Sequence, residues 1–277
     1  MGWLPMRLAW PPILIVASLA MSGAVAGPLE DAMAAFQRGD YATAYALTRP
    51  LADQGNAAAQ FGLGDMLERG KGVVQNYAEA ASWYHLAADQ GNAVAQSSLG
   101  LMYATGRGVP QDYAEALKWF RLAAYQGIAA AQSNLGVMYH DGKGVPPDYA
   151  EAIKWLRSAA NQGDAVAQSN LGLIYDQGQG VAQSYAEAAR WYGLAADQGI
   201  AAAQSNLGIL YANGQGVAQN YILSHMWFNL AAAQGDAAAL ANREYAAAEM
   251  TPEQIAEAQR LAREWKPKQA GAPPPRE

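Results

Sequence analysis

The chain has 277 residues, of which 52% are hydrophobic and 15% are charged, so it can bury a sizeable core and is not a highly charged disordered protein. Its formal net charge is -6, and no run of basic residues alternates with aromatic ones, so we expect no nucleic-acid partner. The chain contains no cysteine, which excludes disulfides, thiol nucleophiles and cysteine-ligated zinc.

The amino terminus has the order of a secretory signal peptide. One arginine precedes a short apolar run, residues 13–25, and small residues in the pattern A-x-A end at Ala26. This order predicts a signal peptide over residues 1–26, cut before Gly27, and an exported protein that is periplasmic or secreted. The alternative is an uncleaved anchor, which the shortness of the run and the two prolines before it disfavour. We expect no stable membrane insertion after cleavage.

Residues 56–235 form five blocks of 36 residues in register. Residues 27–55 form a degenerate leading repeat, because Tyr41 lies 36 residues before Tyr77 at the same position of the pattern. Self-similarity at this period predicts a stack of helical repeats. The recurring glutamines are Gln60, Gln96, Gln132, Gln168 and Gln204. The recurring Leu-Gly pairs are Leu63-Gly64, Leu99-Gly100, Leu135-Gly136, Leu171-Gly172 and Leu207-Gly208.

Each block contains two helical patterns, and both helices are expected to be amphipathic. The second helices are predicted to begin at the cap residues Asn76, Asp112, Asp148, Ser184 and Asn220. Four of these caps are followed three residues later by Glu79, Glu115, Glu151 or Glu187. This spacing predicts a capping box, in which the glutamate accepts a hydrogen bond from the N–H of the cap residue.

Two kinds of glycine mark the helix ends. A Gly-x-Gly follows every first helix, beginning with Gly70-Lys71-Gly72. A phosphate-binding loop would need a strand before it, so we interpret these glycines as helix terminators. A Gln-Gly pair ends each second helix and is followed in most blocks by a cap for the next helix, as in Gly91-Asn92. The helices should therefore double back as antiparallel neighbours.

The glycine of each Leu-Gly pair lies inside a helix, where it costs about 1 kcal/mol relative to alanine. We expect its missing Cβ to let the tryptophan-bearing second helix approach closely. The tryptophans, one per block, are Trp83, Trp119, Trp155, Trp191 and Trp227. They could form a ladder for glycan or cationic ligands, but their spacing favours a place in the core.

The array is followed by two predicted capping helices over residues 236–265. The second of them opens with Thr251 as a cap and Pro252 at the first helical position, a strong helix start. It should seal the open end of the stack. Residues 266–277 are rich in proline and are predicted to be a disordered tail.

The pattern A-x-A-Q-x-x-L-G-x-M-Y-x-x-G-x-G-V-x-x-D-Y-x-E-A-x-x-W-x-x-x-A-A-x-Q-G, present five times, resembles the Sel1-like repeat, a relative of the tetratricopeptide (TPR) repeat. The resemblance implies an all-α fold, an α-α superhelix in the form of a right-handed solenoid. It also implies an adaptor for protein assembly or signalling, commonly exported in bacteria. A cysteine-rich branch of the family includes proteins reported to bind or hydrolyse β-lactams, and this chain lacks those cysteines.

The three histidines, His85, His140 and His225, lie in three different columns of the repeat. None forms the i, i+4 pair of a zinc site, and none has a regularly placed carboxylate partner except His140 with its neighbour Asp141. We therefore predict no catalytic residue, no metal site and no cofactor.

Candidate binding residues lie in two columns where the blocks differ and in a recurring serine column one or two turns earlier. By resemblance to TPR arrays, the first helices line the concave face of the stack, and their variable residues project into its groove. The candidates are Glu68, Arg69, Ser97, Thr105, Ser133, His140, Asp141, Ser169, Asp176, Gln177, Ser205 and Asn213. The alternative is an ordinary solvated helix face.

The favoured hypothesis is an exported, non-enzymatic scaffold that binds a protein or peptide in the concave groove, in periplasmic signalling or assembly. The alternative is a cell-wall or β-lactam-related binding protein or hydrolase with a pocket near His140. A third possibility is a periplasmic regulator that restrains a membrane receptor. No residue pattern identifies the partner or the oligomeric state.

Overall fold

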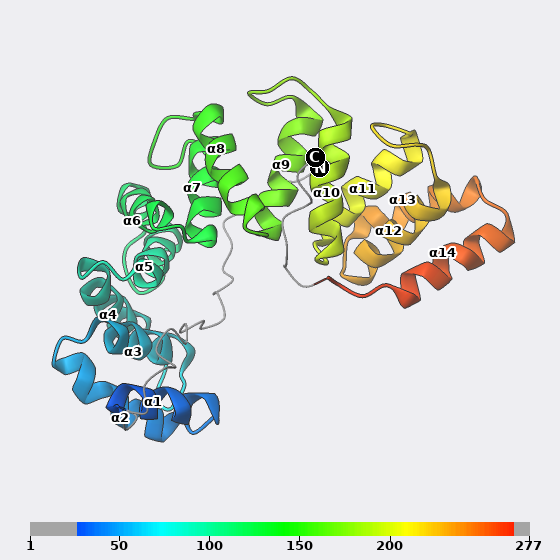
Figure 1. Cartoon of the computed structure of the whole chain (residues 1–277). Coiled ribbons are helices and arrows are strands. Elements are labelled where there is room, and N and C mark those ends of the chain that lie inside the picture. Colours follow the sequence, from blue (N-terminus) through cyan, green and yellow to red (C-terminus); the bar gives the residue numbers. More distant parts are fainter. Residues whose placement is uncertain (1–26, 269–277) are drawn as a thin grey trace. The chain divides into compact units, whose positions relative to one another are not determined.

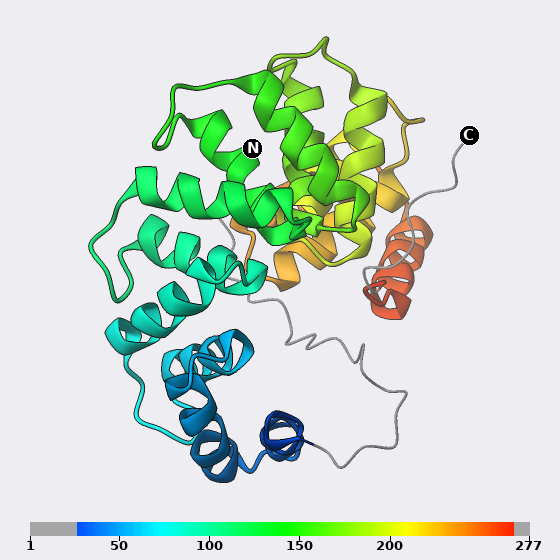
Figure 2. The ribbon, with the colours of Figure 1, turned by 60° about the vertical axis from the view of Figure 1, so that its left-hand side comes forward.

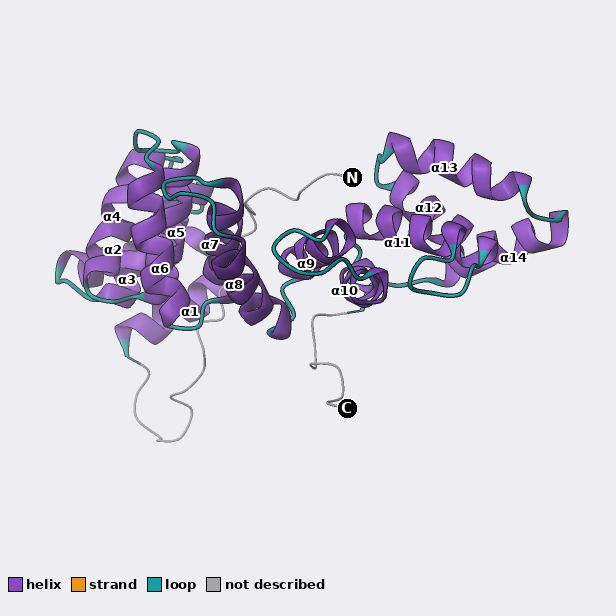
Figure 3. Ribbon diagram, turned by 90° about the horizontal axis from the view of Figure 1, so that it is seen from above, coloured by secondary structure: helices purple, strands orange, loops and turns teal. Residues whose placement is uncertain are grey.

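A computed structural model describes residues 27–268. The predicted signal peptide, residues 1–26, and residues 269–277 of the predicted tail lie outside the described residues. Every regular element between residues 27 and 268 is a helix (Figure 3). The helices are α1 (Pro28–Gln37), α2 (Tyr41–Asp53), α3 (Ala57–Arg69), α4 (Tyr77–Asp89), α5 (Ala93–Thr105), α6 (Tyr113–Tyr125), α7 (Ala129–Asp141), α8 (Tyr149–Asn161), α9 (Ala165–Gln177), α10 (Tyr185–Asp197), α11 (Ala201–Asn213), α12 (Tyr221–Ala233), α13 (Ala237–Ala248) and α14 (Pro252–Glu264).

The described chain divides into two compact units, residues 27–147 with α1–α7 and residues 148–268 with α8–α14. In the first unit each helix packs against the next one in the chain (Figures 1 and 2). In the second unit α9, α10 and α11 pack in the same order, and α12 contacts α11, α13 and α14. The stacking of consecutive helices buries apolar faces that no single repeat could bury alone.

The predicted caps of the second helices are confirmed, but the capping box is wrong. Each cap side chain accepts an N–H of the first turn, as Asp112 does from Glu115 at 3.1 Å. The N–H of the cap residue donates instead to a carbonyl of the first helix, as in Asp112 to Tyr103 at 2.9 Å. In three blocks the glutamate, one turn before the tryptophan, accepts the indole Nε1–H, as Glu115 does from Trp119 at 3.1 Å. In the fourth block Nε1 of Trp191 has no hydrogen-bond partner among the described residues. Where both bonds form, one residue pattern fixes the loop and the tryptophan together.

The two glycines of each Gly-x-Gly have different tasks. The first ends the helix in the left-handed conformation, as Gly70 does at a φ of 65°, so the terminator prediction is confirmed. The second also has positive φ and lies directly against the residue that begins the preceding second helix, either against its carbonyl, as Gly108 does at Tyr77, or against its Cβ, as Gly180 does at Tyr149. A side chain there would collide with that residue. Each loop therefore rests on the repeat before it.

The glycine inside the first helix lets the second helix approach closely, as predicted, and at Gly64, Gly100, Gly172 and Gly208 it meets an aromatic ring other than the tryptophan. A Cβ at Gly64 would lie 2.7 Å from the ring of Tyr84, and one at Gly100 would lie 2.8 Å from Phe120. Both rings directly follow a tryptophan in the sequence. The tryptophans themselves are buried at positions 119, 155, 191 and 227, and Trp83 is half-buried. The prediction that they form core is confirmed for those four.

The recurring glutamines connect consecutive repeats. Gln60 donates its Nε2–H to the carbonyl of Ala52 in the preceding second helix at 3.3 Å. Its Oε1 accepts from Gln90, at the end of the following second helix, at 2.7 Å. Gln96, Gln168 and Gln204 make the same two bonds. A buried amide with both ends satisfied explains why this column repeats.

The carboxyl-terminal helix starts as predicted. Thr251 caps α14 and shares a reciprocal capping box with Gln254. The helix packs on α12, where Trp265 contacts Trp227 at a centroid distance of 6.3 Å. Lys268, within the predicted tail, donates to a carboxylate oxygen of Asp197 at 2.7 Å.

Candidate functional site

The structure separates the candidate binding residues into two groups. Five lie exposed at the carboxyl ends of first helices: Arg69, Thr105, Asp141, Gln177 and Asn213. His140 is partly buried, and the remaining six are buried: Glu68, Ser97, Ser133, Ser169, Asp176 and Ser205. The expectation that the four serines project from their helices is not met, since their exposed fractions are 8%, 2%, 3% and 7%.

The serines are buried because the first helices are enclosed on nearly every side. In α9, every residue from Ala165 to Asp176 is buried. The prediction that first helices are amphipathic is therefore wrong for such a helix, which contacts second helices on both of its flanks. Only its last turn reaches solvent.

The carboxylates of Glu68 and Asp176 accept hydrogen bonds from buried tyrosines. The hydroxyl of Tyr84 donates to Oε2 of Glu68 at 3.0 Å, and that of Tyr192 donates to Oδ2 of Asp176 at 3.5 Å. The second and fifth blocks have alanine at the carboxylate position and phenylalanine at the tyrosine position. The acid is thus present where the ring carries a hydroxyl, a signal that the sequence contained and our sequence analysis missed.

Charged groups gather around the end of α3. Oδ1 of Asp65 accepts from Nε of Arg69 at 2.6 Å, and Oε1 of Glu68 lies 3.7 Å from a guanidinium nitrogen of Arg107 in the next loop. Burial, and secondarily the charge of Asp65, raises the pKa of Glu68 to about 7 despite the hydrogen bond from Tyr84. Burial also raises the pKa of Asp65. The folded structure therefore disfavours the ionised forms of both carboxyl groups.

A smaller cluster occupies the end of α7. Nδ1 of His140 lies 2.9 Å from Oδ1 of Asp141, and Nζ of Lys143 lies 2.8 Å from Oδ2. Asp141 therefore bridges the histidine and the lysine of the following loop. The sequence set His140 and Asp141 apart, and the structure joins their side chains and adds Lys143. Among residues 27–268, no group of three histidine, aspartate or glutamate side chains could hold a metal ion.

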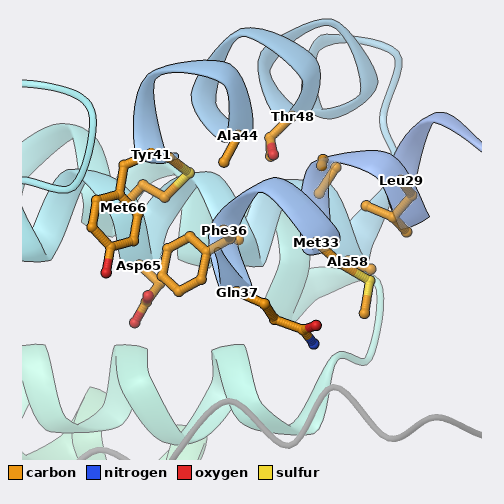
Figure 4. Close-up of a pocket in the computed structure, with 13 residues that line it drawn as sticks. Leu29, Met33, Phe36, Gln37, Tyr41, Ala44, Thr48, Ala58, Asp65 and Met66 are labelled. Atoms are coloured by element: carbon orange, nitrogen blue, oxygen red, sulfur yellow. The ribbon is translucent and has the colours of Figure 1, made fainter. Parts of the chain in front are cut away.

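A cavity of about 320 Å³ lies between α1, α2 and α3 (Figure 4). Its walls are mostly apolar and include Leu29, Met33, Phe36 and Met66. Asp65 also lines it, next to Phe36 in Figure 4. Our sequence analysis did not anticipate this cavity.

No helix in the described part of the chain has both the length and the apolar character needed to cross a membrane.

Paired helices at a fixed period, glycine-ended loops and one glutamine link per repeat define an all-α repeat superhelix. The Sel1 repeat model matches residues 57–92, 93–128, 129–164, 165–200 and 201–236. The chain belongs to the Sel1 repeat family, which confirms the resemblance and the predicted fold class.

Two solved structures are similar over most of the chain. One is c5321, a protective antigen present in uropathogenic Escherichia coli strains, with 37% identity and a TM-score of 0.76 over 86% of this chain. The match spans 53% of c5321, so this chain corresponds to about half of that protein. The other is a Sel1 repeat protein from Oxalobacter formigenes, with 33% identity and a TM-score of 0.73 over 86% of this chain and 100% of that one. No curated protein matches the sequence.

Proposed function

We propose that this chain is an exported, non-enzymatic scaffold that binds a protein or peptide segment through the exposed ends of its first helices, in periplasmic signalling or assembly. Sel1 repeat proteins generally mediate protein–protein interactions and are typically non-catalytic. The amino-terminal sequence supports export, because it has the order of a signal peptide.

One observation carries the binding proposal. The exposed position at the end of each first helix holds a different residue in every repeat, whereas buried columns such as the glutamines and the Leu-Gly pairs recur. From the first block to the fifth these residues are Arg69, Thr105, Asp141, Gln177 and Asn213. Packing does not dictate these side chains, so each unit presents dissimilar polar groups at the ends of its first helices that can select a ligand.

The test is capture of partners in native cells by crosslinking, followed by their identification. One variant carries alanine at Thr105, Asp141, Gln177 and Asn213. A matched control carries alanine at Lys118, Lys154 and Arg190, which are exposed on second helices, where each pairs with a surface glutamate and lies over the ring of the next residue, a tryptophan. We expect the first variant to lose a specific partner and the control to retain it. Equal capture by both variants would exclude the first-helix ends as the binding surface.

Export is tested separately by fractionation and amino-terminal sequencing. The expected product is a periplasmic or secreted chain that begins at Gly27. An intact amino terminus in the membrane fraction would show an uncleaved anchor instead.

A further inference from the structure

The cavity between α1, α2 and α3 exists because two repeat positions hold small residues there. In the second unit, Tyr192 of α10 interacts with the side chain of Asn206 in α11. Four repeats earlier in the chain, the same two repeat positions are occupied by Thr48 in α2 and Gly62 in α3. A Cβ on Gly62 would have only the methyl group of Thr48 nearby, at 3.8 Å. The volume that a ring and an amide fill elsewhere is open here.

A third repeat position places a carboxylate in the wall of this opening. The residue that corresponds to Asp65 in the other four blocks is apolar: Leu101, Val137, Leu173 and Ile209. The side chain of Asp65 is 1% exposed, and its Oδ1 pairs with Arg69. Its Oδ2 is buried and has no hydrogen-bond partner among the described residues. A buried carboxylate oxygen without a donor is costly, so a ligand that supplies one is strongly favoured.

The two ends of the cavity differ in chemistry. Asp65 lies at one end with Phe36 and Tyr41, whereas Met33 and Leu29 lie towards the other (Figure 4). The rings of Phe36 and Tyr41 meet edge to face at a centroid distance of 5.0 Å. Nζ of Lys71 already lies over the ring of Tyr41, at 4.7 Å from its centroid, so the ring left beside the buried carboxylate is that of Phe36. An aromatic ring beside a buried carboxylate favours a cation, and the aliphatic end favours an apolar stem.

The placement of charge supports a cationic ligand. Asp65 and Glu68 are buried, with side chains 1% and 4% exposed, whereas their partners Arg69 and Arg107 are 35% and 38% exposed. Water screens the two guanidinium groups more than it screens the carboxylates. The interior side of the cluster is therefore electronegative.

We propose that this cavity binds a primary ammonium group on an apolar stem. The ammonium donates to Oδ2 of Asp65, and the stem lies along Met33 and Leu29. The group belongs either to a free alkylamine or to a lysine side chain of a bound protein. The site shares only Arg69, the ion partner of Asp65, with the exposed helix ends invoked above. Arg69 is unchanged in the crosslinking variants and the test of the cavity uses only the purified chain, so the two proposals fail independently.

The test is isothermal titration calorimetry with n-pentylammonium chloride and, as a neutral probe of similar size, 1-pentanol. A second arm uses a blocked pentapeptide with lysine at its centre and the same peptide with norleucine. We expect saturable binding of the ammonium probe or the lysine peptide, and at least tenfold weaker binding of the matching neutral probe. Tighter binding of the peptide assigns the site to a partner's lysine, and tighter binding of the free amine assigns it to a small molecule.

Three variants locate the binding. Asp65→Asn removes the charge at constant shape and should weaken binding of the cation at least tenfold. Gly62→Asn introduces the residue found in three other blocks, fills the cavity and should abolish binding of every probe. Ser98→Asn introduces the same residue at the corresponding position of the next block, away from the cavity. This variant should bind the probes like the native chain.

Two results would overturn the proposal. One is the absence of saturable binding of both cationic probes up to millimolar concentration. The other is binding that is unchanged in Asp65→Asn and in Gly62→Asn. Should Asp65→Asn fail to fold, Gly62→Asn decides alone, because Gly62 has ordinary helical backbone and space for a side chain.

Discussion

At the α10–α11 junction the buried ring of Tyr192 fills the space between repeats, whereas at the α2–α3 junction Thr48 and Gly62 leave it open. Both junctions keep the helix lengths and glutamine bonds of the repeat, although the side chain of Asn56 caps α3 and Ile200, at the same position before α11, makes no such bond. The comparison teaches that these local signals suffice to build the stack. The residues between helices then decide whether a junction is solid or hollow.

Removing the ring that fills the α10–α11 junction should have the largest effect on stability. Tyr192→Thr removes a fully buried ring and the donor to Asp176, and it should lower the free energy of unfolding by about 3–5 kcal/mol. Urea denaturation followed by circular dichroism measures the loss. Tyr192→Phe is the control, because it keeps the volume and should lose only about 1 kcal/mol. A loss below about 1 kcal/mol for Tyr192→Thr would mean that the ring does not support the junction.

A second effect should appear as pH dependence near the hollow junction. The pKa of Glu68 is raised from 4.5 to about 7 in the folded chain, so between these values the folded state binds more protons than the unfolded state. Stability should therefore fall as pH rises from about 4.5 to about 7, by up to about 3 kcal/mol at roughly 1.4 kcal/mol per pH unit. Burial raises the pKa of Asp65 as well, which adds to the same trend.

Glu68→Gln separates this contribution from the rest of the chain. The amide still accepts from Tyr84 but does not ionise, so the variant should gain stability over the native chain at pH 8 and not at pH 4. Glu249→Gln, at an exposed glutamate, is the control. Parallel stability curves for the native chain and Glu68→Gln from pH 4 to 8 would contradict the prediction.

The substitution of glycine by alanine, made once at each junction, tests whether the two junctions differ in packing. Gly172 contacts the ring of Tyr192, so the Cβ of Gly172→Ala overpacks a closed core and should destabilise by about 1–3 kcal/mol. Gly62 faces the cavity, so Gly62→Ala should stabilise by up to about 1 kcal/mol through helix propensity. Gly193→Ala, with open space at its Cβ, is the control and should behave like Gly62→Ala. Thermal melts measure whether each variant gains or loses stability. A change of the same sign in Gly62→Ala and Gly172→Ala would show that the two junctions do not differ in packing.

The helices, caps and loop glycines could be predicted because they depend on neighbours in the sequence and recur. The hydrogen bond from Trp119 to Glu115 could not, because it depends on Tyr103 supplying the carbonyl that the cap residue uses instead. The burial of Ser133 likewise follows from second helices on both sides of its own helix, which periodicity alone does not reveal.

Part of the candidate site was present in the sequence as departures from the repeat. Thr48, Gly62 and Asp65 each break a column, and Glu68 changes together with Tyr84. Comparing each departure with the column would have indicated a distinct site at the first junction. Its volume and the missing partner of Asp65 could not be predicted, because they depend on how the shortened α1 packs.

The smallest expected effect concerns the loops that rest on each junction. Nζ of Lys71 lies 4.7 Å from the centroid of Tyr41, whereas the last loop has Gln215 at the corresponding position, next to Gly216, which lies against Tyr185. Lys71→Gln should cost about 0.5–1 kcal/mol, the usual value of an exposed cation–π contact. Because Tyr41 also packs on Phe36, a double-mutant cycle with Tyr41→Leu isolates the pair.

Gln215→Lys is the reciprocal change and should gain a similar amount if the ring of Tyr185 accepts the new cation. Urea denaturation of the four chains of the cycle gives the coupling between Lys71 and Tyr41. A coupling of zero, together with no gain from Gln215→Lys, would show that the residue between the two glycines does not act through the ring. The first and last loops would then be equivalent, and the difference between the junctions would lie only in the residues buried between their helices.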